Sequence, residues 1–229
     1  SLKTKDPSYD IIEWIGRAYE PFIGKWSSTD NFYKPGYSEF IDLDSPNTNA
    51  DQIKTPGSHL SYAHDILLAL SDSSISLESA TSDAAIIFKG GPHASGGGSG
   101  VPMIIAYNWD YSNSASQEVY RVYKSDDTTL KFTGSIKPSE IYEYYYLAWT
   151  AYAIVPEKNS EGDFNLTLYY DYRPWKGEKY SDGKKALLIS HIKRFRFLQQ
   201  DRTIEFGLCA FDKLNDEQNV TFCGKKVVF

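Results

Sequence analysis

The feature that most constrains the fold is a period-two alternation of apolar and polar residues in the second half of the chain. In "KRFRF" (193–197) two phenylalanines alternate with two arginines, and "TIEFGLCAF" (203–211) repeats the pattern. Successive side chains of a strand point to opposite faces, so this pattern predicts antiparallel strands with one buried and one solvated face. No strand–helix–strand repeat indicates a parallel sheet.

Further strands are expected where short apolar runs end at turn-forming residues. These runs are 39–43, 74–80, 83–88, 101–109, 117–124, 129–136, 144–156 and 165–175, with a last edge strand over 219–229. The 18 Tyr and 12 Phe support this interpretation, because aromatic side chains pack well on a pleated surface.

Two helices are predicted. Asp6 and Pro7 are a typical N-cap and first-turn proline, and the apolar residues after them recur at helical spacing to Gly16 or as far as Pro21. The second helix is expected over 60–70, where leucines and alanine form one stripe. The predicted fold class is therefore α+β: an N-terminal helix followed by a mainly antiparallel β-sheet, in a single domain over 1–229.

The motif search predicts no catalytic, cofactor or metal residues. The glycine-rich stretch 90–100 lacks the Gly-Lys-Ser/Thr of a phosphate loop. The net charge of −6 argues against nucleic-acid binding, and the arginines of "HIKRFRF" fall on the opposite face from its phenylalanines. None of the four histidines lies in a metal-binding pattern; they are His59, His64, His93 and His191.

Cys209 and Cys223 are the only cysteines. The thirteen residues between them are too many for a redox CxxC motif or a typical zinc ligand pair. A disulfide would close a loop of about 15 residues and add about 3 kcal/mol of stability in the loop-entropy account. Two free thiols in a cytosolic protein are the alternative, and the spacing leaves both open.

Several segments together resemble the soluble domain of a type IV pilin or type II secretion pseudopilin, in particular minor pilins of the ε-proteobacterial type. The segments that carry the resemblance are "IIEWIGRAYEPFIG", "PGYSEFIDLDSP", "IKTPGS", "LAWTAYAIVP", "LYYDYRPWKGEKYSDGKKALLISHIKRFRF" and "IEFGLCAF". The prepilin peptidase site and the hydrophobic helix that define that family are missing from this sequence.

The resemblance implies a pilin-like fold whose C-terminal loop is closed by a Cys209–Cys223 disulfide. It also implies a non-catalytic subunit that helps to assemble or cap a pilus, secretion or DNA-uptake filament. Its partners would be other pilin or pseudopilin subunits, and the absent helix would anchor it in the inner membrane, facing the periplasm or cell surface. Neither a cofactor nor a small-molecule substrate is expected.

Two other functions remain open. A secreted carbohydrate-binding or adhesin domain would use exposed aromatic rings as a stacking platform, for example around Trp175 and Tyr180. A hydrolase would need two converging carboxylates, and Glu143, Asp171 and Glu178 lie among aromatic residues.

Overall fold

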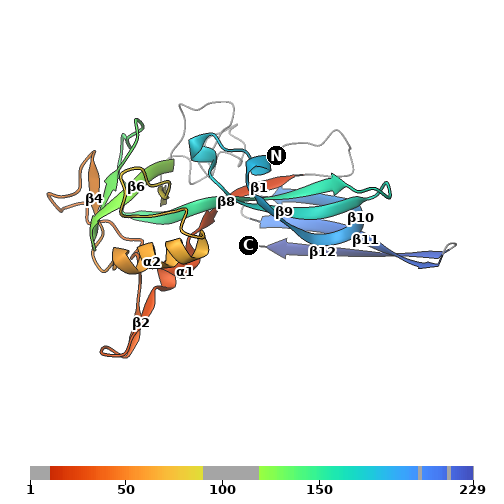
Figure 1. Ribbon diagram of the computed structural model, residues 1–229, viewed down its shortest axis with the longest axis horizontal. Coiled ribbons are helices and arrows are strands. Elements are labelled where there is room, and N and C mark those ends of the chain that lie inside the picture. The colour runs from red at the N-terminus through yellow and green to blue at the C-terminus, as the bar shows by residue number, and fades with distance from the viewer. Residues whose placement is uncertain (1–10, 90–118, 201–202, 216–217, 229) are drawn as a thin grey trace. The chain divides into compact units, whose positions relative to one another are not determined.

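The computed structural model describes residues 11–89, 119–200, 203–215 and 218–228 (Figure 1). Strands account for 51% of the structure and helices for 13%, and the sheet pairings are antiparallel. The protein is therefore a mainly antiparallel β protein, and the predicted α+β class with an N-terminal helix before the sheet is wrong.

The N-terminal segment shows why that prediction failed. Residues Ile12–Arg17 form strand β1, which pairs with strand β8 (Tyr144–Lys158), and a helix of five residues, α1 (Tyr19–Ile23), follows. The isoleucines and tryptophan of this segment fit either a helix stripe or a pleated surface, but β-branched and aromatic residues favour the strand. Gly16 further weakens a helix. Asp6 and Pro7 lie outside the described residues.

The chain divides into two compact units. We call residues 15–151 and 173–179 the helical unit, and residues 1–14, 152–172 and 180–229 the cysteine unit. Strand β8 contributes residues to both units. The expectation of a single domain over 1–229 stays a prediction.

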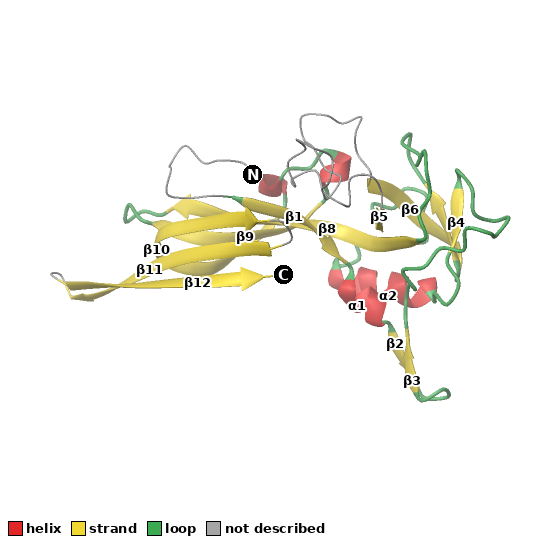
Figure 2. Ribbon diagram, turned by 180° about the vertical axis from the view of Figure 1, so that it is seen from behind, coloured by secondary structure: helices red, strands yellow, loops and turns green. Residues whose placement is uncertain are grey.

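The helical unit has a sheet with the order β8-β5-β6-β7-β4. The strands are β4 (Gln52–Lys54), β5 (Ala85–Lys89), β6 (Val119–Asp126) and β7 (Thr129–Phe132). Helix α2 (Leu60–Leu70) buries Leu60, Ala63 and Leu67 in the same apolar core as these strands. Strands β2 (Lys25–Ser27) and β3 (Phe32–Lys34) form a separate hairpin (Figure 2). Leucine and alanine at helical spacing thus provide the stripe that the sheet buries.

The segment Pro174–Lys176 (η3) is held to the helical unit by one aspartate. The carboxylate of Asp83 forms ion pairs with Arg121 at 2.9 Å and with Lys176 at 2.7 Å. Its backbone carbonyl also accepts a hydrogen bond from Trp175 Nε1 at 2.8 Å. This network explains why a short stretch between strands of the cysteine unit belongs to the helical unit.

The cysteine unit has the strand order β8-β9-β10-β11-β12. These strands are β9 (Phe164–Tyr172), β10 (Lys184–Gln200), β11 (Thr203–Asn215) and β12 (Gln218–Val228), with a single 3-10 turn, η4 (Tyr180–Asp182). One apolar cluster of this unit consists of buried Leu166, Ile192 and Phe195 with partly exposed residues around them. Further buried apolar residues of the unit are Ile11, Ala153, Val155, Tyr169 and Tyr172.

Most of the predicted elements are confirmed. The helix over 60–70 and the strands at 83–88, 117–124, 129–136, 144–156, 165–175 and 219–229 match α2, β5, β6, β7, β8, β9 and β12. The strands expected at 39–43 and 74–80 are wrong, because Phe40 makes only an isolated bridge to Tyr144 and 74–80 forms turns. Segments 90–100 and 101–109 lie outside the described residues. Within the described residues, helices long and apolar enough to span a membrane are not found.

Candidate functional site

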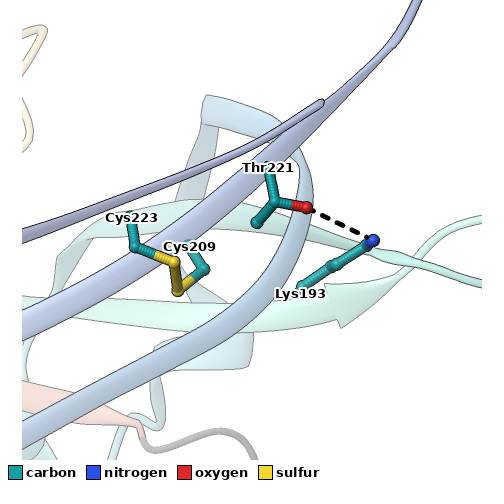
Figure 3. Close-up of a disulfide and its surroundings, with 4 residues drawn as sticks. All are labelled: Lys193, Cys209, Thr221 and Cys223. Carbon is teal, nitrogen blue, oxygen red and sulfur yellow. Dashed lines mark hydrogen bonds between the residues drawn. A yellow bond between two sulfur atoms is a disulfide. The ribbon is translucent and has the colours of Figure 1, made fainter. Parts of the chain in front are cut away.

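The two cysteines lie directly opposite each other on neighbouring strands. Cys209 of β11 and Cys223 of β12 are register partners, and the structure joins them in a disulfide with Cα atoms 4.1 Å apart (Figure 3). Neither cysteine is free. Of the two alternatives that the sequence leaves open, the structure has the cross-linked one.

The strand register determines which side chains share a face with the disulfide. Arg194 is the partner of Cys209 on β10, and Arg196 is the partner of Gly207, which in turn pairs with Lys225 of β12. Alternation along each strand places these side chains on the face that carries the sulfur atoms. We call this surface the cysteine face.

A shallow groove of about 580 Å³ lies on the cysteine face. Gly207 lies on this face two residues from Cys209 and contributes only backbone to the groove, so the groove is open beside the disulfide. Its lining residues are Arg194, Arg196, Phe197, Leu198, Glu205, Gly207, Leu208, Cys209, Cys223, Gly224 and Lys225. The sequence pattern places the arginines opposite the phenylalanines, but only the register brings the arginines beside the cysteines.

Positive charge is in excess on this face. Lys193 Nζ lies 3.5 Å from Thr221 Oγ1 (Figure 3). It also lies 4.7 Å from the centre of the Phe211 ring, and Lys225 Nζ pairs with Glu205 at 2.7 Å. In the described part of the chain, no ion pair joins Arg194 to a carboxylate. This local excess contrasts with the net charge of −6 of the whole chain.

Strand β12 is the edge of the sheet, and among the described strands none pairs with its outer side. The Cα distance of 4.1 Å identifies Cys209 and Cys223 as a non-hydrogen-bonded pair, since such pairs lie near 4.5 Å and hydrogen-bonded pairs near 5.5 Å. The N–H and C=O of Cys223 therefore point away from β11. By alternation the same holds for Thr221, Lys225 and Val227, all of which are at least partly exposed.

A second cluster lies elsewhere in the cysteine unit. His191 Nδ1 is 3.0 Å from Asp163 Oδ2 and 4.0 Å from Glu161 Oε2, and one donor atom from each residue lies within 4.8 Å of the others. The hydrogen bond from His191 lowers the pKa of Asp163. These three residues could hold a divalent cation, but the hydrogen bond between His191 and Asp163 also accounts for their proximity.

The other histidines have separate roles. His64 Nδ1 accepts a hydrogen bond from the backbone N–H of Leu77 at 3.2 Å, and its other ring nitrogen lies 3.7 Å from Glu78. The ring of His59 lies 5.3 Å from that of Tyr62. His93 is outside the described residues. His191 is thus the only one of the three described histidines that joins a carboxylate cluster.

The carboxylates of the hydrolase hypothesis have different partners. Asp171 pairs with Lys184 at 3.0 Å in the cysteine unit, and Glu178 pairs with Arg173 at 3.1 Å in the helical unit. The side chain of Glu143 is exposed, and its backbone carbonyl accepts the N–H of Ile41. The described contacts do not group these residues as a catalytic pair.

The aromatic platform is not where the sequence suggested. Trp175 is only 8% exposed, and the ring of Tyr180 packs against that of Tyr169 at 5.2 Å. Three exposed aromatic side chains lie instead on the β2–β3 hairpin: Trp26, Phe32 and Tyr33. The rings of Trp26 and Tyr33 are 5.4 Å apart at 70°, which is an edge-to-face pair and not a coplanar row.

Comparison with known proteins adds no relative: no family model matches the chain, and neither a curated protein nor a solved structure matches it.

Proposed function

We propose that this protein is a non-catalytic binding protein of an oxidising compartment outside the cytoplasm, and that a partner protein adds an extended segment to the open edge of β12. The observation that carries the proposal is the register of Cys209 and Cys223, which directs the backbone groups of alternate β12 residues away from β11. Strand addition to such an edge supplies main-chain hydrogen bonds, and the side chains beside it give specificity.

Two features of the edge support a specific partner. A disulfide is typical of exported proteins, because cytosolic thiols are kept reduced. The exposed side chains of Lys225 and Lys226 flank the edge, and edge lysines discourage indiscriminate pairing between strands. Charge complementarity therefore favours a segment that alternates acidic and β-branched residues.

The test uses a ten-residue peptide of alternating Glu and Val as the probe, with a Lys–Val peptide of the same length as the control. Amide exchange is followed by NMR. Before peptide is added, the amides of Cys223 and Lys225 should exchange faster than those of Gly224 and Lys226. The acidic peptide should slow the first pair, and the basic peptide should not. The proposal fails if the outward amides are already protected, or if the acidic peptide leaves them unchanged.

Proline variants distinguish the contribution of the outward backbone N–H groups to peptide binding from that of the side chains. Lys225→Pro removes an outward N–H, whereas Lys225→Ala removes the same charge and keeps the N–H. Lys225→Pro should therefore bind the peptide more weakly than Lys225→Ala, at similar stability. Lys226 is the register partner of Phe206, so its N–H faces β11 and Lys226→Pro should instead destabilise the hairpin. Equal destabilisation by both prolines would contradict the assigned register.

The filament role that the resemblance implies is the special case in which the partner is another subunit. It stays a prediction, because strand β1 occupies residues that were expected to be helical, and this removes a structural argument for it. Its direct test is cross-linking between subunits at the β12 edge.

A carbohydrate-binding role is a second candidate, favoured by the exposed rings of Trp26 and Tyr33. These side chains are 53% and 56% exposed on a short hairpin. Binding of neutral oligosaccharides should change tryptophan fluorescence in the native protein, and this change should be lost in Trp26→Phe. If Trp26→Phe keeps the full signal, the hairpin is not the sugar site.

A further inference from the structure

The Cys209–Cys223 disulfide lies at the protein surface and not in a core. Cys223 is exposed on the edge strand, and Cys209 is partly exposed on the strand beside it. The groove opens beside the bond, where Gly207 has no side chain. A small thiol can therefore approach the sulfur of Cys223 from the open side.

The charged groups that face the disulfide come from all three strands and are mostly cationic. Arg194 is the direct neighbour of Cys209 in register, and directly opposed side chains on one face have Cβ atoms about 4.5–5.5 Å apart. Arg196 and Lys225 occupy the next row. Lys193 reaches Thr221, two residues before Cys223. Glu205 lies one row further and pairs with Lys225.

These cations act differently on the two redox states. A disulfide carries no charge, whereas each thiol of the reduced form can ionise. A cation at about 4–6 Å favours the thiolate, and arginine keeps its charge throughout the relevant pH range. The cysteine face therefore stabilises the reduced form relative to the disulfide, and it makes Cys209 a better leaving group.

We propose that Cys209 and Cys223 form a redox-active disulfide that exchanges with a dithiol reductant. In the first step, a thiolate of the dithiol attacks Sγ of Cys223, the S–S bond breaks, and its electron pair leaves on Cys209 beside Arg194. The second thiol of the reductant then loses its proton to water and attacks the mixed disulfide, which releases the thiolate of Cys223. The reductant becomes a disulfide, and the protein has gained two electrons.

The hairpin allows this cycle to be reversible. Strands β11 and β12 stay in continuous register from Ile204 and Val228 to Lys213 and Asn219, on both sides of the disulfide. Cleavage of the disulfide therefore leaves the two thiols facing each other, so the effective concentration for re-oxidation stays high.

The experiment equilibrates the full chain with oxidised and reduced dithiothreitol at pH 8 and at pH 5.5, and it counts free thiols by alkylation and intact mass. Arg194→Gln removes a cation beside Cys209. Lys226→Gln removes one from the opposite face and is the matched control. At pH 8, Arg194→Gln should shift the equilibrium about tenfold towards the disulfide, or about 30 mV. Lys226→Gln should not shift it.

The pH dependence of the Arg194→Gln effect distinguishes an electrostatic cause from a structural one. Both thiols are largely protonated at pH 5.5, so the effect of Arg194→Gln should shrink there, whereas a purely structural effect would persist. Absorbance of the thiolate at 240 nm gives a second readout in the reduced protein: at least one cysteine pKa should lie below the usual value of about 8.5 and rise in Arg194→Gln. A wild-type thiol pKa at or above that value, or an Arg194→Gln shift that is absent or equal at both pH values, would overturn the proposal.

Discussion

The two units of this protein reach stability by different routes. In the helical unit, α2 and the sheet bury a continuous core in which Tyr37, Leu67 and Tyr145 are fully inaccessible. In the described part of the cysteine unit fewer apolar side chains are buried: Leu166, Ile192 and Phe195 form one cluster, and Ile11, Ala153, Val155, Tyr169 and Tyr172 are also buried. Apolar area removed from water is the main source of stability. A unit with a small core therefore depends more on its cross-link and its hydrogen bonds.

The units also differ in how they pair their charges. In the helical unit, the carboxylate of Glu39 forms ion pairs with Arg17 at 2.6 Å and with Lys89 at 2.8 Å. Both cations also lie over the ring of Tyr146. On the cysteine face, Lys225 pairs with Glu205 at 2.7 Å, and no ion pair among the described residues joins Arg194 to a carboxylate. Among the described contacts, the charges of Arg17 and Lys89 are therefore paired with a carboxylate, whereas that of Arg194 is not.

The largest expected effect is in the core of the helical unit. Leu67→Ala should reduce the free energy of unfolding by about 2–5 kcal/mol, because it removes buried methyl groups and leaves a cavity. Leu70→Ala on the same helix is the control, since Leu70 is 40% exposed and should cost much less. Urea denaturation measures both variants. Similar losses in the two variants would contradict the assigned face of α2.

The next largest effect is expected in the cysteine unit. There the disulfide should contribute more to the free energy of unfolding than any single apolar residue outside the core. Replacing both cysteines by serine should reduce stability by about 2–4 kcal/mol, because the unfolded chain regains the entropy of a loop of about 15 residues. Hydrogen exchange should show lost protection in β11 and β12 and unchanged protection in α2. If α2 loses protection equally, the two units unfold as one.

The secondary-structure predictions were correct where the local sequence pattern and the tertiary environment favour the same element. Helix α2 and strands β8, β9 and β12 were predicted because their apolar residues follow the period of the element in which they pack. The prediction for the N-terminal segment was wrong because its apolar residues fit both the period of a helix and that of a strand. Its pairing with β8, which lies far away in sequence, decides the outcome.

The candidate site was predicted only in part. Cys209 and Cys223 could be named from the sequence, and the alternation of arginines and phenylalanines predicted a solvated face that carries the arginines. The location of Arg194 beside Cys209 depends on the register between β10 and β11, which includes an irregularity between Ile192 and Arg194. A one-residue change in register would move the arginine to the other face, so the sequence alone could not identify this neighbour.

The smallest expected effect compares one carboxylate from each unit. In the cysteine unit, Glu157 accepts hydrogen bonds from Tyr169 and from Thr167, the latter at 2.7 Å. Burial tends to raise the pKa of Glu157, but the hydrogen bonds outweigh burial and lower it, while burial and Glu157 raise the pKa of Tyr169 to about 12. In the helical unit, the hydrogen bond from Lys124 lowers the pKa of Glu78, whose side chain is 57% exposed.

A carboxylate whose pKa is lowered by folding stabilises the protein above its ordinary pKa, and this contribution is lost as the pH falls through the lowered value. Glu157→Gln should therefore cost about 1 kcal/mol at pH 7, and the difference from wild type should shrink as the pH falls through the lowered pKa of Glu157. Glu78→Gln should change little at either pH, because exposed ion pairs are screened by water. Thermal unfolding of both variants between pH 7 and pH 3 measures the difference. A Glu157→Gln deficit that persists undiminished at pH 3 would assign its effect to side-chain packing instead of to the charge of Glu157.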